Sequence, residues 1–157
     1  MKILITDAAN LDFIRLTKEL DENLNGISAD RPEEERTKYA SFNELSDITK
    51  AFVMYDKEIA IGCAAFKKYT TDTVEVKRVF ISKNYRGKGL SKILLSELEK
   101  QVENDGFSRL VLETGKNNQT AVSMYKGLNY IEIDNFPPYT EMEDSICLSK
   151  DLILMVT

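Results

Sequence analysis

One short loop combines two glycines with a group of cations, and these residue types together could bind an anion. The segment NYRGKGLSK, residues 84–92, follows the apolar run VFIS and precedes the leucine-rich segment ILLSELEKQV. A turn from a strand into a helix points several backbone N–H groups and the positive end of the helix dipole at one place. Gly87 and Gly89 carry no side chain that would keep an anion from the backbone, and Arg86 and Lys88 add positive charge. The loop therefore predicts a phosphate site.

The basic charge of the chain is concentrated around the same loop. Residues 77–100 hold seven basic and two acidic side chains, whereas the whole chain of 157 residues has a net charge of −5. This distribution favours a local site for an anionic ligand and disfavours general binding to nucleic acid. An ordinary turn with solvated lysines is the competing interpretation.

The loop differs from two well-defined phosphate-binding sequences. A Walker A loop needs G-x-x-x-x-G-K-[ST], and a dinucleotide fingerprint needs G-x-G-x-x-G. Here Gly87 and Gly89 are followed by apolar helix residues instead of a third glycine, and the preceding strand comes after a β-hairpin instead of opening a βαβ unit. ATP and NAD are therefore disfavoured as ligands, and a nucleotide-binding domain stays as a third alternative.

The chain contains no histidine, which limits the chemistry that its side chains can perform. Imidazole bases, Ser-His and Cys-His nucleophile pairs and almost every common zinc site are excluded, so we expect no metal. Cys63 and Cys147 lie in the apolar segments IGCAAF and SICLS, where we expect buried thiols outside any disulfide. An acid or base must then be a carboxylate, tyrosine, lysine or cysteine, and a covalent cysteine intermediate is not expected.

Two segments resemble motifs of the GNAT N-acyltransferases, a family that uses acetyl-CoA or related thioesters. Residues 86–91 are similar to the pyrophosphate loop [QR]-x-x-G-x-[GA] of that family, with Ser91 in place of the usual glycine or alanine. The segment NQTAVSMYKGLNY is similar to the family's N-x-x-A-[IV]-x-x-Y-x-x-x-G-F segment. The matching residues there are Asn118, Ala121, Val122 and Tyr125. The resemblance implies the GNAT fold and acetyl-CoA as cosubstrate.

Asn129 stands where family members usually have the glycine that precedes the last aromatic residue, here Tyr130. Asparagine is the next best residue in the left-handed conformation with which a chain leaves a helix, so we expect the geometry to be kept. The order of elements also resembles the family's from residue 1 to about 152. The resemblance in element order implies a single domain over residues 1–157.

The resemblance implies contacts with acetyl-CoA in three places. The residues implied for the pyrophosphate are Arg86, Gly87, Lys88, Gly89, Leu90 and Ser91. The backbone of Val79 and Ile81 is implied as a ladder for the pantetheine arm, and Asn118 as a side-chain contact. Asn118 could also cap the helix that follows it, and the two roles are compatible.

Transfer of an acyl group from a thioester to an amine needs an acid for the leaving thiolate. The resemblance implies Tyr125 in that role, close to the sulfur. A phenol with a reference pKa of about 10 stays protonated at pH 7 and can donate. A tyrosine that only packs in the core is the alternative.

The reaction also needs a base for the amine, and Glu75 is the first candidate. It lies on the strand that leads to the loop, where some family members carry a catalytic glutamate, and alternation predicts that it shares a face with Lys77 and Val79. A solvent-facing glutamate paired with Lys77 or Lys68 is the alternative. Glu113, at the end of the segment LVLET, is the second candidate.

The acceptor side is expected at the two N-terminal helices and a late acidic loop. Residues 127–149 include five acidic side chains and no basic one, so Asp134, Glu141 and Glu143 could attract a cationic amine. Ordinary solvated loop charge is the alternative. Tyr139, in the segment FPPYTEME, could form a wall of the acceptor pocket or could be a surface aromatic residue.

A mixed α/β scaffold has to position these residues. Apolar spacing predicts a helix over residues 10–23, with Asn10 as its cap, and a strongly periodic helix from Leu90 to a break at Asp105. The full predicted order is β-α-α-β-β-β-α-β-α-β-β. The predicted strands are 3–6, 51–56, 58–69, 73–82, 108–114, 129–134 and 145–152, a short helix begins at Pro32, and another covers 119–128.

Bulk properties agree with one compact domain, since 43% of the residues are hydrophobic and can form a core. The N-terminal segment MKILITDAAN has too short an apolar run for a signal peptide or a membrane span, so we expect a cytoplasmic protein without membrane contact. The apolar tail LILMVT either completes the last strand or contacts a partner, and a homodimer is one option.

These features together predict an N-acetyltransferase that moves an acetyl group from acetyl-CoA to a primary amine by direct attack in a ternary complex. The acceptor would be a small molecule or a peptide. The alternative is a non-catalytic acyl-CoA-binding module with the same fold, used for regulation or for docking a partner.

Overall fold

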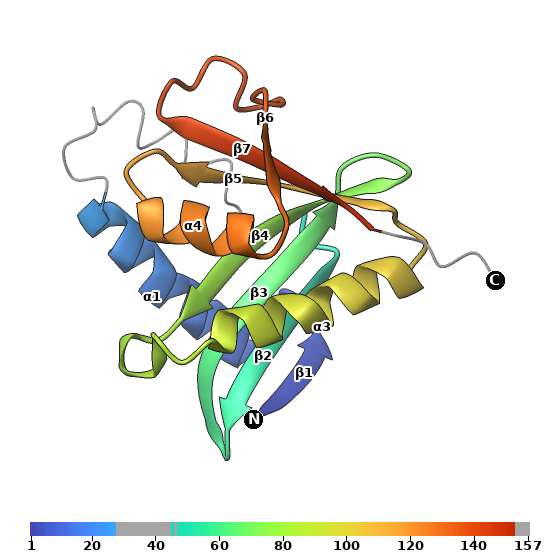
Figure 1. The fold of residues 1–157 in the computed structure, drawn as a ribbon. Coiled ribbons are helices and arrows are strands. Elements are labelled where there is room, and N and C mark those ends of the chain that lie inside the picture. The colour runs from blue at the N-terminus through green and yellow to red at the C-terminus, as the bar shows by residue number, and fades with distance from the viewer. Residues whose placement is uncertain (28–44, 46, 153–157) are drawn as a thin grey trace. The chain divides into compact units, whose positions relative to one another are not determined.

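The computed structural model describes residues 1–27, 45 and 47–152, which form a mixed α/β protein (Figure 1). Within these residues a seven-stranded sheet has the order β1-β2-β3-β4-β5-β7-β6. The strands are β1 (Lys2–Thr6), β2 (Lys50–Asp56), β3 (Ile59–Lys68), β4 (Thr73–Ile81), β5 (Arg109–Gly115), β6 (Ile131–Ile133) and β7 (Ser145–Asp151). The α-helices are α1 (Leu11–Ile27), α3 (Leu90–Asn104) and α4 (Gln119–Gly127), and a short 3₁₀ helix, η1 (Lys83–Tyr85), lies between β4 and α3. The predicted mixed α/β class is therefore confirmed.

The chain forms two compact units, and each is described by itself. Unit 1 comprises residues 1–67 and 76–100, and unit 2 comprises residues 68–75 and 101–157. Strand β4 contributes its first three residues to unit 2 and the rest to unit 1. The single domain over residues 1–157 stays a prediction.

Unit 1 is built on an antiparallel arrangement of β1, β2 and β3. Ile3 pairs with Met54, and Met54 pairs with Gly62. Lys57 has a φ of 57° in the two-residue connection from β2 to β3, which agrees with the tight turn that the sequence predicts there.

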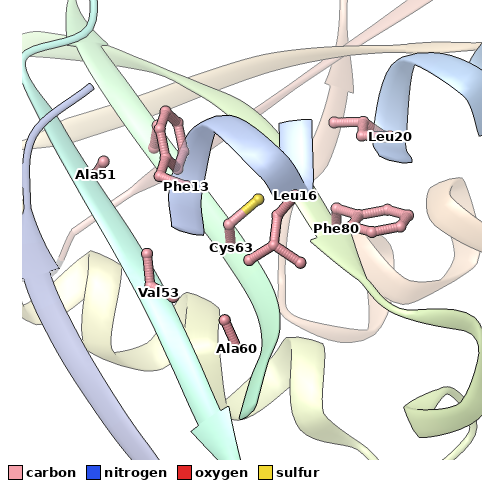
Figure 2. Packing of buried hydrophobic residues seen from close by; sticks show 9 residues of the cluster. Phe13, Leu16, Leu20, Ala51, Val53, Ala60, Cys63 and Phe80 are labelled. Atoms are coloured by element: carbon pink, nitrogen blue, oxygen red, sulfur yellow. The ribbon is translucent and has the colours of Figure 1, made fainter. Parts of the chain in front are cut away.

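The core of unit 1 lies where α1 packs on the sheet, as Figure 2 shows. Spacing of three and four residues places Phe13, Leu16 and Leu20 on one side of the helix, and all three are buried. The residues that they join in the cluster are Ala51, Val53, Ala60, Cys63, Ala65 and Phe80. The helix begins as predicted, because the Asn10 side chain accepts a hydrogen bond from the Phe13 N–H at 3.0 Å.

The predicted end of this helix at residue 23 is wrong, since α1 continues to Ile27. Asparagine has only a modest unfavourable helix propensity, so two asparagines near the end do not terminate a helix that is already packed. The helical turn predicted at Pro32 and residues 153–157 of the apolar tail lie outside the described residues.

Unit 2 is built on β5 and β7, which pair antiparallel along their full length. Glu75, in the part of β4 that belongs to this unit, pairs in parallel with Val111, and Glu113 pairs with Cys147. Paired residues point to the same side of a sheet, as do residues two apart on a strand. Glu75, Glu113 and Cys147 therefore share one face.

Strand β6 is shorter than predicted and covers three residues instead of six. Asn129 has a φ of 74°, and the Tyr130 N–H donates to the Tyr125 carbonyl at 3.1 Å. Both residues therefore form the turn that follows α4, and the strand starts only at Ile131. The left-handed conformation predicted for Asn129 is confirmed.

Packing under α1 predicts a large effect of truncation at Leu16, whose side chain is 0% exposed. Leu16→Ala should lower the free energy of unfolding in urea by about 2–5 kcal/mol, because it removes buried methyl groups and leaves a cavity. Leu11→Ala, on the same helix at 81% exposure, is the matched control and should change it by less than about 0.5 kcal/mol. Equal effects of the two substitutions would contradict the packing described for α1.

Candidate active site

In unit 1 the segment between β4 and α3 contains the 3₁₀ helix η1 and then a turn that depends on glycine. Gly87 has a φ of 77° and Gly89 a φ of 74°, in the left-handed region that other residues rarely adopt. A Cβ atom added at either position would meet nothing within 4 Å. The two glycines therefore serve the backbone conformation and leave open space above it, into which a ligand could fit.

The Arg86 side chain holds this turn against the end of the strand. Its Nε donates to the Ile81 carbonyl at 2.7 Å, and its guanidinium carbon lies 5.3 Å from the centre of the Phe80 ring. Lys88 lies close to an aromatic ring in the same way, with its Nζ 5.4 Å from the centre of the Tyr85 ring. The sequence predicted both cations as ligand contacts but gave no sign of these contacts within the loop.

Helix α3 starts directly after Gly89. Leu90 is buried at its first position and Ser91 is half-buried. The first four N–H groups of a helix have no acceptor within the helix, and the N-terminal end of the helix dipole is positive. The first turn carries Lys92 and no acidic residue, so the electrostatics of this helix start are suited to an anion.

Strand β4 has a backbone irregularity at Arg78 that its sequence pattern does not predict. Arg78 has a φ of 59°, and its buried guanidinium donates to the Thr17 carbonyl at 2.8 Å and to Asp21 Oδ1 at 2.7 Å. A left-handed residue interrupts the regular alternation of side chains along a strand. The alternation counted from Glu75 is therefore interrupted at Arg78, so it does not place Val79 on the same face as Glu75. The adjacent basic pair at 77–78, inside an alternating segment, is the one sequence signal of this irregularity.

In unit 2, Asn118 caps α4. Its Oδ1 accepts a hydrogen bond from the Ala121 N–H at 3.3 Å, which confirms the capping role that the sequence left open beside a cofactor contact. Tyr125 lies on the buried face of this helix, with its ring edge-on to Tyr130 at 5.5 Å. Burial raises the pKa of the Tyr125 phenol, so the group stays protonated at neutral pH.

Glu75 and Tyr139 meet inside unit 2. The Tyr139 hydroxyl donates to Glu75 Oε2 at 2.7 Å, and both residues are only 2% exposed. The alternatives of a solvent-facing Glu75 and of a surface aromatic at position 139 are therefore wrong, because the sheet face and the late loop enclose both side chains. Burial, followed by the charges of Glu75 and Glu113, raises the pKa of Tyr139 and keeps its hydroxyl a donor.

The second carboxylate, Glu113, lies on the same face of the sheet. Its Oε1 accepts a hydrogen bond from Ser145 Oγ at 3.0 Å. Burial raises the pKa of the Cys147 thiol to about 11 and that of Cys63 to about 12, so both are poor nucleophiles at neutral pH. The prediction of buried thiols outside any disulfide is confirmed.

The acidic late loop differs from this buried cluster. Asp134, Glu141 and Glu143 are exposed, which is compatible both with attraction of a cationic amine and with simple solvation. Among the described residues, no group of three or more acidic or cysteine side chains could hold a metal ion. None of the described helices combines the length and apolar character needed to cross a membrane.

A sequence model of the Acetyltransferase (GNAT) family matches residues 13–130. This match covers more than half of the chain and includes Glu75, the glycine loop, Asn118 and Tyr125. The chain therefore belongs to the GNAT family, as the resemblance of its motifs indicated.

A curated relative supports this assignment. The uncharacterized N-acetyltransferase YsnE of Bacillus subtilis is 30% identical over 93 residues, which are 58% of this chain and 62% of YsnE. The match therefore spans less than two thirds of that relative.

Solved structures share the fold over nearly the whole chain. A Klebsiella pneumoniae protein provisionally assigned as an acyl-CoA N-acyltransferase superposes with a TM-score of 0.79 at 24% identity and covers 97% of both chains. The PaiA N-acetyltransferase of Thermoplasma acidophilum, in complex with coenzyme A, gives a TM-score of 0.71 at 21% identity over 96% of this chain and 99% of that one. The predicted GNAT fold is confirmed.

The cap at Asn118 predicts a specific pattern of stability changes. Asn118→Ala should lower the free energy of unfolding by about 1 kcal/mol, because the Ala121 N–H loses its acceptor. Asn118→Asp keeps an acceptor oxygen at this position and should retain most of the native stability. Urea denaturation measures both, and faster amide exchange at Ala121 in the alanine variant alone would locate the effect. An alanine variant as stable as the native chain would contradict the capping role.

Proposed function

We propose that this protein is an N-acetyltransferase that moves an acetyl group from acetyl-CoA to a primary amine of a small molecule or peptide. The observation that carries the proposal is the turn after β4, where two left-handed glycines lie beneath open space beside exposed cations. Membership of the GNAT family and the coenzyme A bound in the PaiA structure support acetyl-CoA as the ligand of this turn.

The residues of the turn fit the pyrophosphate of acetyl-CoA. Backbone N–H groups from Gly87 to the start of α3 would bind its oxygens, with Arg86 and Lys88 balancing its charge. In unit 1 the further contacts proposed are Gly89, Leu90 and Ser91 for the pyrophosphate and the backbone of Val79 and Ile81 for the pantetheine arm. In unit 2, Asn118 is proposed as a side-chain contact with the cofactor. When bound, acetyl-CoA supplies an acetyl thioester whose thiolate leaves.

Tyr125 is the proposed acid. Its phenol holds a proton at neutral pH because burial raises its pKa, and the leaving sulfur needs one proton when the carbon–sulfur bond breaks. A direct attack in a ternary complex agrees with the poor nucleophilicity of both cysteines.

Glu75 is the proposed base, with Glu113 as the second candidate. As the carbon–nitrogen bond forms, the amine must lose a proton, and a carboxylate can accept it directly or through an ordered water. Glu75 is buried and oriented by a hydrogen bond, which is typical of a positioned catalytic group. Both carboxylates lie on one face of unit 2.

The acceptor is proposed to approach the acidic late loop. Exposed Asp134, Glu141 and Glu143 would attract an amine in its cationic form. A cytoplasmic location, the absence of nucleic-acid and membrane partners, and a homodimer stay predictions.

A charge reversal in the loop tests the ligand assignment. Gly89→Asp should weaken acetyl-CoA binding tenfold or more, or about 1.4 kcal/mol and above, because a carboxylate then faces the pyrophosphate. Gly106→Asp is the matched control, since Gly106 has a φ of 90° and open space around it but lies just after α3 ends. Isothermal titration calorimetry of both folded variants measures the effect. Equal acetyl-CoA affinities of the two variants would contradict the assignment of this turn to the pyrophosphate.

Turnover distinguishes an enzyme from a binding module with the same fold. Tyr125→Phe and Glu75→Gln should each lower kcat at least a hundredfold while acetyl-CoA affinity stays within about threefold of the native value. Coenzyme A release with spermidine, tyramine and an alanyl peptide as probe amines measures the rate, and calorimetry measures the affinity. A native chain that binds acetyl-CoA but releases no coenzyme A with a broad amine panel would favour the non-catalytic module.

A further inference from the structure

We propose that Tyr139 is a positioning residue, which fixes the Glu75 carboxylate in one orientation and stabilises its charged form. This inference rests on the proposed function, in which Glu75 is the base. Its geometric basis is the 2.7 Å hydrogen bond from the Tyr139 hydroxyl to Glu75 Oε2, made between two side chains that are each 2% exposed.

The backbone around Tyr139 is fixed by one amide side chain. Asn135 Nδ2 donates to the Tyr139 carbonyl at 3.2 Å and to the Met142 carbonyl at 3.1 Å. The Tyr139 N–H donates to the Phe136 carbonyl at 2.7 Å, and the Met142 N–H donates to the Tyr139 carbonyl at 2.9 Å. Two successive turns are thus joined, and Tyr139 lies where they meet.

The aromatic ring of Tyr139 is fixed as well. Phe136 packs edge-on against it, with ring centres 5.4 Å apart, and Tyr69 packs edge-on against Phe136 at 5.3 Å. Tyr69 also donates from its hydroxyl to the Pro137 carbonyl at 2.9 Å. The loop is therefore attached to the segment before β4, and the Tyr139 hydroxyl is held on Glu75 before any substrate arrives. Such preorganisation is what a catalytic carboxylate needs.

The charges around Glu75 explain why a neutral donor is useful there. The titratable groups near Glu75 in unit 2 include Tyr139 from the loop, Tyr69 from the segment before β4 and Cys147 from β7, and Glu113 of β5 shares its sheet face. In general, a hydrogen bond from an O–H donor favours the charged form of a carboxyl group. Because a phenol is uncharged, it stabilises the carboxylate without cancelling the negative charge that accepts a proton.

A titration of the carboxyl groups tests this directly. The protein is labelled with glutamate enriched in ¹³C at the carboxyl carbon, and the Glu75 resonance is assigned from its loss in Glu75→Gln. In Tyr139→Phe the titration midpoint of this resonance should move up by about one pH unit, because a hydrogen bond to a charged group is lost. Tyr55→Phe is the matched control: it removes the hydroxyl that donates to Asp12 Oδ2 at 2.6 Å in unit 1, a phenol–carboxylate hydrogen bond like that of Tyr139, and it should leave the Glu75 midpoint in place.

Kinetics supply the second readout. Tyr139→Phe should lower kcat for the probe amine about tenfold, leave the KM for acetyl-CoA unchanged, and move the acidic limb of the pH profile of kcat upward with the NMR midpoint. Tyr55→Phe should retain the native profile. If Tyr139→Phe instead damaged the loop as a whole, the KM for acetyl-CoA would change as well as kcat.

The outcomes separate the two proposals. An unchanged midpoint in Tyr139→Phe, or equal shifts in both phenylalanine variants, would overturn the positioning role whatever the activity. A native protein that acetylates no amine would contradict the proposed function, while the NMR titration would still decide the contact. If Tyr139→Phe does not fold, Asn135→Ala, which loosens the same turns, should raise the midpoint, and an unchanged midpoint there would also overturn the proposal.

Discussion

The turn from β4 into α3 depends on left-handed backbone at Gly87 and Gly89, and the ligand assignment depends on that turn. Glycine adopts this conformation with the least strain, and its missing side chain keeps the space above the backbone open. The Arg86 side chain closes the turn onto the carbonyl of Ile81, so the same residue that adds charge also shapes the backbone. Conformation and electrostatics at this helix start therefore favour the same kind of ligand, an anion.

Unit 2 encloses a carboxylate side chain, that of Glu75, which is 2% exposed. A buried charge is unfavourable unless hydrogen bonds compensate it. Here the Tyr139 hydroxyl and Ser145 Oγ donate to Glu75 and Glu113, respectively. The loop between β6 and β7 holds Tyr139 in place, and its sequence thereby affects a group on β4. Mutations far from Glu75 in the chain can consequently change its chemistry.

Local signals made much of this structure predictable from the sequence. The apolar period of α3 and the left-handed Asn129 depend on residues close in the chain, and both agree with the structure. The left-handed Arg78 was not predicted, because arginine does not favour that conformation and tertiary contacts must impose it. The hydrogen bond from Tyr139 to Glu75 joins residues 64 positions apart and depends on the register of the sheet, which no short motif encodes.

The most direct test of the account is calorimetric titration of the purified native chain with acetyl-CoA and coenzyme A, with ATP and NAD as controls. The account predicts micromolar binding of the two coenzyme A compounds and no comparable binding of the controls, because the open turn after β4 is assigned to that pyrophosphate. Folded protein that binds neither coenzyme A compound, or that binds ATP or NAD equally well, would contradict it.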